Sequence, residues 1–338
     1  MTLTRLTGTP GVTRLAASFA VSLAAMAGLP SLATAADANW PTRPVRVVSA
    51  FSTGSGPDAM LRLVADRLSR TWGQQVVVEN KPGGSGFIAA NDAKRAAPDG
   101  NTLFHADGLN FTAIPHMYKK LPYDPVKDFT PVIPLHHSYF FVAVAANSPW
   151  KTAGDMLAAA KAKPGTVTYG SWQIGSVAHL GGAQLEAASG TRMTHVPFKD
   201  NSQLYTSVAN GEVDWAFGTA GSAGPLQKSG KLRFLALAGP ERLSTHPDVP
   251  TLGDAGGPKG FETSGWVGLF APAGTPTDIV DKINRDIAAI VGTPDMQPRM
   301  MDFGYMPLAI KPADVRALID KESAQYAKVV KTINLSLD

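Results

Sequence analysis

Hydrophobic and polar residues alternate along the chain with two different spacings, and the first elements follow a regular order. Short β-branched runs predict strands over residues 44–51, 75–79 and 102–106. Hydrophobic residues three and four positions apart predict helices over residues 58–72 and 87–97. This strand–helix–strand–helix–strand order predicts a parallel sheet with helices on both faces.

The same alternation continues through the rest of the chain. Further strands are predicted over residues 140–145, 167–170, 213–217 and 232–238, with a short one ending at Pro197, and helices over residues 152–162, 176–189, 202–210, 277–291 and 312–332. The pattern predicts an α/β fold, and the length of 338 residues suggests two domains.

The N-terminal segment has a different pattern. Arg5 and Arg14 precede a hydrophobic run over residues 15–32, and an Ala-Thr-Ala sequence ending at Ala35 follows it. This order predicts a secretory signal peptide over residues 1–35, cleaved after Ala35, and a periplasmic mature protein. An uncleaved membrane anchor is the alternative. No later segment approaches the roughly 18 consecutive hydrophobic residues that a spanning helix needs, so we expect a soluble mature protein.

Composition narrows the classes of partner and chemistry. The chain has 31 Lys and Arg against 27 Asp and Glu without a clustered basic tract, so we expect no nucleic-acid partner. It has no cysteine, which excludes disulfides, thiol catalysis and cysteine-ligated metal sites. Motifs for phosphate cofactors and for zinc are absent from the sequence, and no cofactor is predicted.

Loops rich in glycine and hydroxyl residues follow several predicted strands. They span residues 52–58, 107–110, 170–176, 197–202 and 218–221. Ligands of open α/β sheets bind beyond the carboxyl ends of the strands, and the free N–H groups at a helix start attract anions. We therefore expect an anion site in these loops, although each loop taken singly is also explained as a simple turn.

Candidate catalytic and metal-binding residues are few. His136 and His137 are adjacent, so on a strand they would point to opposite faces, which disfavours a shared metal ion. His179 and His195 are interpreted as hydrogen-bonded structural residues. Asp214 is either a strand-end cap or an anchor of the ligand site. Because the sequence shows no arrangement of nucleophile and base, we do not expect an enzyme.

Eight segments, in their order and spacing, are similar to one known family. They are residues 40–46 (WPTRPVR), 77–86 (VVENKPGGSG), 97–103 (APDGNTL), 118–129 (YKKLPYDPVKDF), 195–199 (HVPFK), 230–233 (GKLR), 247–251 (PDVPT) and 269–276 (LFAPAGTP). From Trp40 to the C-terminus the chain resembles the periplasmic solute receptors of tripartite tricarboxylate transporters, the Bug-type receptors.

The resemblance implies a two-lobed Venus-flytrap fold, in which each lobe is a mixed, mostly parallel sheet flanked by helices. It assigns residues 36–130 and 233–338 to the first lobe and residues 131–232 to the second. A small carboxylate is expected between the lobes, with integral-membrane permease subunits as partners. The expected ligand-binding residues are Phe51, Ser52, Thr53, Gly54, Ser55, Asp107, Ser171, Trp172, Gly175, Ser176, Phe198, Asn201 and Thr219.

The sequence departs from the family in the first of these loops. The family pattern is close to P-F-P-P-G-G-x-x-D, whereas residues 50–58 read AFSTGSGPD, so the identity of the ligand does not carry over. Trp172 in a second loop suggests an aromatic or planar carboxylate. Two other functions stay open: a periplasmic ligand sensor for a kinase, and a secreted α/β enzyme, which would need a nucleophile and base that are not found.

Overall fold

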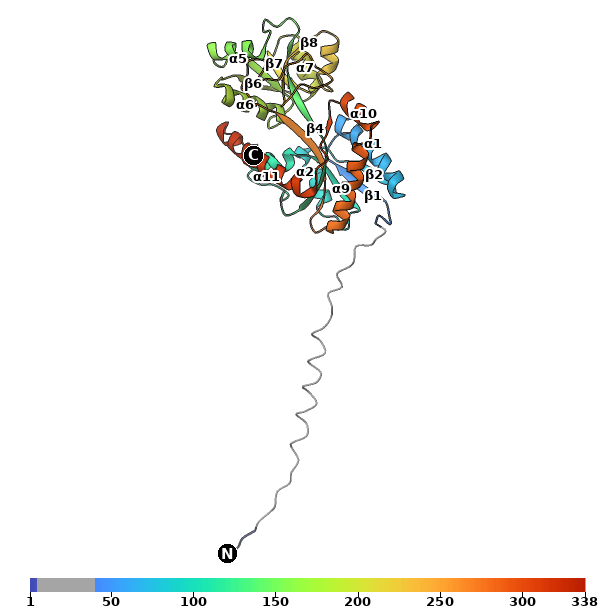
Figure 1. The fold of residues 1–338 in the computed structure, drawn as a ribbon. Helices are drawn as coiled ribbons and strands as arrows, with labels where there is room; N and C mark the ends of the chain where they lie inside the picture. The colour runs from blue at the N-terminus through green and yellow to red at the C-terminus, as the bar shows by residue number, and fades with distance from the viewer. Residues whose placement is uncertain (5–39, 338) are drawn as a thin grey trace. The chain divides into compact units, whose positions relative to one another are not determined.

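The computed structural model describes residues 1–4 and 40–337 (Figure 1). The expected signal peptide and its cleavage site at Ala35 therefore lie outside the described residues, apart from the first four. From Pro41 onward the chain forms one compact unit. Among the described residues, none of the helices is both long enough and apolar enough to cross a membrane.

The first lobe begins with the predicted strand–helix alternation. Its elements are β1 (Val45–Ser49), α1 (Gly56–Trp72), β2 (Val76–Asn80), η1 (Gly84–Gly86), α2 (Phe87–Ala93) and β3 (Thr102–Asp107). The strands β2, β1 and β3 pair in parallel in that spatial order. Helix α1 forms because Met60, Leu61, Val64 and Leu68 fall on one face, and all four are buried.

The second lobe repeats this alternation of strands and helices. Its elements are α5 (Ala153–Ala162), β5 (Thr168–Ser171), α6 (Val177–Ser189), β6 (Thr194–Pro197), α7 (Asn201–Ala209), β7 (Trp215–Gly218), α8 (Gly224–Lys228) and β8 (Leu232–Ala238). Strand β5 pairs in parallel with both β6 and β7. The aromatic rings of Tyr169 and Trp215, fully buried, stack at the centre of this lobe.

Two strands connect the lobes. Strand β4 (Phe129–Ala145) pairs with β9 (Ser264–Pro272) through Tyr139, and beyond that point it pairs with β7 and β8. Strand β9 also pairs with β3, so the ten strands form one continuous mixed sheet. The sequence pattern predicted only the last third of β4 and did not predict β9. The two-lobed α/β architecture itself is as expected (Figure 1).

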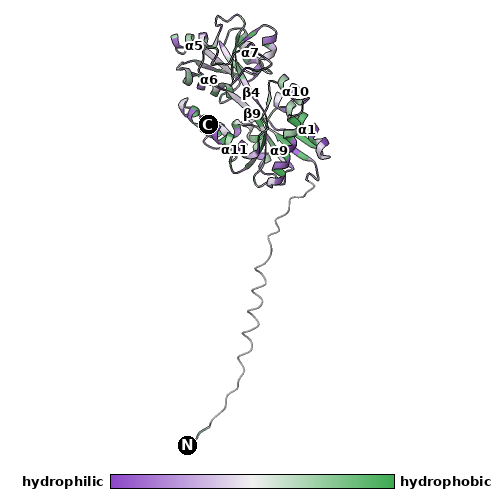
Figure 2. Cartoon of the chain, in the orientation of Figure 1, coloured by the Kyte–Doolittle hydropathy of each residue, from purple (hydrophilic) through white to green (hydrophobic). Residues whose placement is uncertain are grey.

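The C-terminal part of the chain packs against the first lobe. It contains α9 (Thr277–Val291), α10 (Met296–Asp302), β10 (Met306–Pro307) and α11 (Pro312–Thr332). Earlier in the chain, two short helices follow β3, namely α3 (Leu109–Thr112) and α4 (Ile114–Met117). Hydrophobic residues gather along β9 and the adjoining side of α9, as Figure 2 shows. Helix α11 contacts both α3 and α6, which belong to different lobes.

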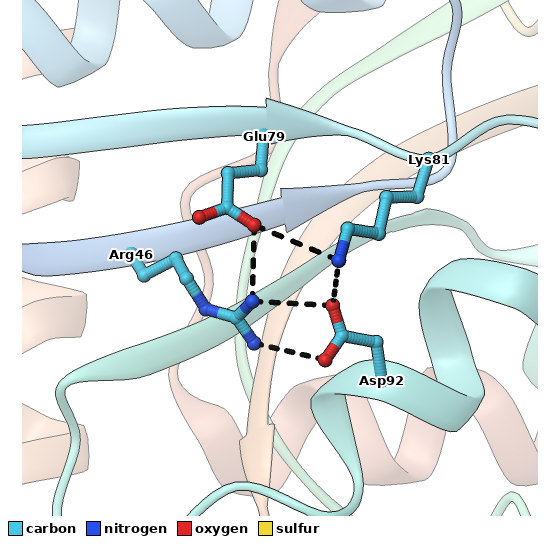
Figure 3. Close-up of polar contacts among 4 residues, drawn as sticks. All are labelled: Arg46, Glu79, Lys81 and Asp92. Atoms are coloured by element: carbon cyan, nitrogen blue, oxygen red, sulfur yellow. Dashed lines mark hydrogen bonds and ion pairs between the residues drawn. The ribbon is translucent and has the colours of Figure 1, made fainter.

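A cluster of four charged side chains holds the start of one glycine loop (Figure 3). Arg46 on β1 bonds to Glu79 on β2 at 3.0 Å and to both carboxylate oxygens of Asp92 on α2 at 3.1 Å. Lys81 bonds to the same Asp92 and lies 3.7 Å from Glu79. Because Lys81 directly precedes the loop 82–86, this cluster fixes where that loop leaves the sheet.

Candidate ligand-binding site

Both lobes line one cavity of about 900 Å³, which is within the usual size range of small-molecule sites. The first lobe and the C-terminal segments contribute residues 50–52, 55–57, 82–86, 107, 109, 110, 114, 117, 136, 138, 265–267, 303, 305 and 337, and the second lobe contributes residues 140, 172–177, 201, 219, 221 and 222. The starts of α1 and α6 therefore meet the same cavity, one from each lobe.

The first loop, between β1 and α1, is held by a buried carboxylate. Asp58 Oδ2 accepts hydrogen bonds from the Gly54 N–H (2.8 Å) and from Arg62 Nε (3.0 Å), and Oδ1 accepts one from Asn80 Nδ2 (2.7 Å). Burial alone would raise the pKa of Asp58, but the bonds from Arg62, Asn80 and Gly54 outweigh it and hold the pKa below its ordinary value. Asp58 is therefore charged at neutral pH and fixes the loop.

Ser55 has a buried hydroxyl that the rest of the loop does not bond. It occupies the N-cap position of α1, yet its side chain makes no capping bond. Its Oγ is buried and has no hydrogen-bond partner among the described residues. A buried polar atom without a partner is costly, and Ser55 lines the cavity, so this hydroxyl is a candidate contact for a ligand or a water molecule.

The second loop, between β5 and α6, is held by neutral side chains. Ser171 Oγ donates to the Gln173 carbonyl (2.9 Å) and accepts from His195 Nε2 (2.7 Å). His179 Nδ1 accepts from the Gly175 N–H (3.0 Å), and its ring stacks on that of His195. Burial lowers the pKa of His179 to about 4 and that of His195 to about 3, so both rings are neutral at neutral pH.

The structure brings nine of the expected ligand-binding residues together in the cavity lining, namely Phe51, Ser52, Ser55, Asp107, Trp172, Gly175, Ser176, Asn201 and Thr219. The other four lie outside the lining. Ser171 is fully buried and uses its hydroxyl within the protein, and the Gly54 N–H is bonded to Asp58. Phe198 packs into the core of the second lobe, and Thr53 is exposed.

Other polar residues considered from the sequence have structural roles. Asp214 Oδ2 accepts from the N–H and the hydroxyl of Thr168, so it caps a strand and does not line the cavity. Asp200 accepts from the Gln203 N–H at 2.8 Å and begins α7, which places Asn201 at the cavity. Among the described residues, no group of three metal-ligating side chains could hold a metal ion.

Several lining residues were missed by the sequence reasoning. The loop 83–86 has positive φ at all four positions, and an added Cβ on Gly86 would lie 2.7 Å from Asn110 Nδ2. His136 is buried, its ring stacks on Tyr305 at 3.8 Å, and neither ring nitrogen has a partner among the described residues. The glycine run was a visible signal for the loop, but nothing in the sequence relates His136 to Tyr305.

The charges around the cavity are unusual for an anion site. Among its described lining residues there is no Lys or Arg, and the one carboxylate is Asp107 at the end of β3. Asp107 Oδ1 accepts from the Leu109 N–H (2.9 Å), and burial raises the pKa of Asp107 to about 6. Glu322 on α11 accepts from Trp266 Nε1 (2.9 Å), and burial raises its pKa to about 7.

A two-lobed α/β fold with a cavity lined from both lobes is the architecture of a solute-binding protein. The model of the tripartite tricarboxylate transporter family receptor matches residues 60–335, so the chain belongs to that family. The UPF0065 protein of the gbd 5′ region of Cupriavidus necator is 35% identical over 292 residues, which cover 86% of this chain and 88% of that protein.

Solved structures of related proteins support this family assignment. Rpa4515 of R. palustris, with adipate, has a TM-score of 0.78 and 32% identity, covering 88% of this chain and 99% of that one. MatC of Rhodopseudomonas palustris, with bound malate, has a TM-score of 0.72 and 31% identity, covering 86% and 100%. The family is one of receptors, which confirms the predicted fold class and the prediction of a binding protein instead of an enzyme.

Proposed function

We propose that the protein is an extracytoplasmic receptor that captures a small carboxylate in the cavity for a tripartite tricarboxylate transporter. The observation that carries the proposal is the meeting of two helix N-termini, those of α1 and α6, at one cavity whose described lining residues include no Lys or Arg. The first N–H groups of a helix have no partner within the helix and carry partial positive charge, so together they attract an anion.

In this proposal the carboxylate is held by uncharged donors. Ser55 Oγ is free to donate from the first lobe, and the N–H groups at the start of α6, after Ser176, face it from the second. Phe51 and Trp172 pack on the body of the ligand, while Asn201 and Thr219 bind its other end. Ordered water completes the contacts. The adipate and malate of the two related structures are carboxylates of suitable size.

Binding is coupled to closure of the lobes. The sequence predicts lobe boundaries after residues 130 and 232, whereas we propose residues 40–139 and 264–337 as the first lobe and residues 140–263 as the second. Strand β4 pairs with β9 as far as Tyr139 and Ser264, and beyond that point it pairs with β7 and β8. A ligand can stabilise the closed form only by binding it more tightly than the open form. The closed form is then the one that the permease subunits recognise.

The location follows from the same assignment. A receptor of this family works outside the cytoplasmic membrane, and the sequence of residues 1–35 supports export with cleavage after Ala35. A sensor kinase in place of the permease would need the same cavity and the same closure. A neighbouring gene for a permease or for a kinase distinguishes these two partners.

The test is a thermal-shift and calorimetric screen of the mature protein against mono-, di- and tricarboxylates, both aliphatic and aromatic. Ligand at about 100 times its dissociation constant adds about 2.7 kcal/mol to the unfolding free energy, which raises the melting temperature measurably. A response confined to carboxylates supports the proposal. A flat response to every carboxylate, or stabilisation by neutral solutes only, contradicts it.

A further inference from the structure

We infer that Asp107 binds a cationic nitrogen of the ligand, which makes the preferred ligand a small amino-carboxylate and not a plain dicarboxylate. This inference rests on the proposed function, because it adds a contact at an amino group to a ligand whose carboxylate the helix starts hold and whose other end Asn201 and Thr219 bind. It follows from the position, the bonding and the surroundings of Asp107.

The sheet holds Asp107 in a fixed position, and among the described residues only one of its two carboxylate oxygens accepts a hydrogen bond. Asp107 pairs with Val267 across β3 and β9, and the next residue, Gly108, donates its N–H to the Trp266 carbonyl at 2.8 Å. One carboxylate oxygen, Oδ1, accepts the Leu109 N–H. Within the part of the chain that the structure describes, the other oxygen, Oδ2, makes no hydrogen bond. Because Asp107 lines the cavity, this second oxygen is the acceptor that a ligand can use.

No positive charge of the protein balances this carboxylate. Among the described residues Asp107 forms no ion pair, and it interacts electrostatically with Tyr305 and with Tyr326 and Glu322 of α11, none of which carries a positive charge. A buried charge without a partner is unfavourable, and a second carboxylate brought to the same place would be repelled. A cationic group from the ligand removes this cost.

The walls beside Asp107 also suit a cation. Trp266 and Tyr305 both line the cavity, and Trp266 is fixed by its bond to Glu322. Tyr305 stacks on His136 and Trp266 is only 3% exposed, so these rings act by keeping water away from Asp107, which strengthens its attraction for a cation. The cavity therefore offers partial positive charge at two helix starts and negative charge with aromatic walls at Asp107. A zwitterion that carries both groups matches this distribution, and a dianion does not.

The experiment is isothermal titration calorimetry with matched pairs of ligands at about pH 8, namely succinate and aspartate, glutarate and glutamate, and adipate and 2-aminoadipate. Each pair differs by one amino group. We expect the amino member of the best-binding pair to bind at least roughly tenfold more tightly, equivalent to about 1.4 kcal/mol. Asp107→Asn, which keeps an acceptor for the Leu109 N–H, should reduce this ratio to near unity.

A charge-matched control is Asp254→Asn, which removes one negative charge at an exposed position outside the cavity lining. It should leave the ratio of the two affinities unchanged. The ratio of the two affinities for the unmutated protein should also fall as the pH drops through about 6, because Asp107 takes up a proton there. Glu322, Tyr305 and Tyr326 are the titratable groups that interact with Asp107. The Asp107→Asn variant should therefore lose this dependence if Asp107 is its source.

The outcomes separate the two proposals. If plain dicarboxylates bind as tightly as their amino partners, or if Asp107→Asn leaves the ratio unchanged, the inference is wrong and the proposed function stands. If no carboxylate of either kind binds, the proposed function fails and the inference fails with it.

Discussion

The two loops that begin α1 and α6 share a strand–glycine–helix pattern but are stabilised in opposite ways. In the first loop one charged group, Asp58, accepts the bonds from Gly54, Arg62 and Asn80, and the Ser55 hydroxyl has no partner among the described residues. In the second loop Ser171, Ser176 and His179 all bond within the protein. The first loop therefore offers the cavity a side-chain donor, whereas the second offers backbone N–H groups.

This difference shows that a hydroxyl in a binding loop is not by itself a binding residue. Its role depends on whether another group of the protein already occupies its hydrogen-bonding positions. Asp58 takes over the bonding in the first loop and leaves Ser55 free, but the histidines of the second loop use the hydroxyls beside them. Four substitutions or conditions test this contrast.

Removing the carboxylate of the first loop should have the largest effect. Asp58 is 1% exposed, and Asp58→Ala leaves the Gly54 N–H and Asn80 without their acceptor. We expect a loss of about 3 kcal/mol in unfolding free energy, the usual cost of breaking a buried charged network, measured by urea denaturation. Asp66→Ala on the same helix breaks only an exposed pair with Arg70 and serves as the control, with little loss expected. Equal losses in the two variants would contradict the assigned role.

Acid should weaken the second loop before the first. The pKa of His179 is lowered to about 4, so below the ordinary pKa of 6.5 the unfolded chain takes up a proton at this site that the folded chain does not. The stability from neutral His179 is therefore present above pH 6.5 and is lost as the pH falls toward 4, by about 2 kcal/mol near pH 5. Asp58 stays charged over this range because its pKa lies below 3.8.

Urea denaturation at several pH values measures this effect. His179→Gln keeps an acceptor for the Gly175 N–H but cannot titrate, so its stability should fall less steeply between about pH 7 and pH 5 than that of the unmutated protein. His246→Gln removes a more exposed histidine whose pKa is also lowered by burial, and it should flatten the profile less than His179→Gln does. Parallel pH profiles for the unmutated protein and the His179→Gln variant would rule out this source of acid sensitivity.

Ser171→Ala should lower stability more than ligand binding. The substitution removes the donor to the Gln173 carbonyl and the acceptor for His195 in a fully buried position. The expected cost is about 1–2 kcal/mol of unfolding free energy, with a carboxylate affinity close to normal. A large loss of affinity with unchanged stability would instead place Ser171 in direct contact with the ligand.

Ser55→Ala should show the reverse pattern and the smallest effect. Because Ser55 Oγ has no partner among the described residues, its removal should leave the unfolding free energy unchanged or slightly higher. The affinity for the carboxylate should fall by about 0.5–1.5 kcal/mol, measured by calorimetry. Thr53→Ala, in the same loop but exposed and outside the cavity lining, provides the comparison. An unchanged affinity in Ser55→Ala would remove this hydroxyl from the binding contacts.

The sequence predicts those parts of the fold that depend on local periodicity. Helix α1 appears within a few residues of its predicted range because its buried positions recur three and four residues apart. Strands β1 to β3 do so because each is a short run rich in β-branched and other hydrophobic residues. Strand β9 was not predicted, since Gly265 and Gly268 interrupt its hydrophobic run. The first part of β4 was hidden by Pro131 and Pro134, near which its register with β9 shifts.

The candidate site was predictable where it lies in a loop after a strand. Ser55, Ser176 and Asp107 could be anticipated from that position alone. Trp266 and Tyr305 could not, because they come from distant segments that the tertiary fold brings to the cavity. Nor could the sequence separate Ser171 from its neighbours, since the bond that engages its hydroxyl comes from His195 on another strand.

The end of the chain provides a way to observe binding directly. The N–H of Leu337 donates to the Met117 carbonyl at 2.9 Å, and Leu337 and Met117 both line the cavity, while the preceding Ser336 is exposed. Because the protein has no cysteine, Ser336→Cys would create a unique thiol beside the site. A fluorophore attached there would report ligand capture in real time, and the opening and closing rates would become measurable without a radioactive substrate or a membrane partner.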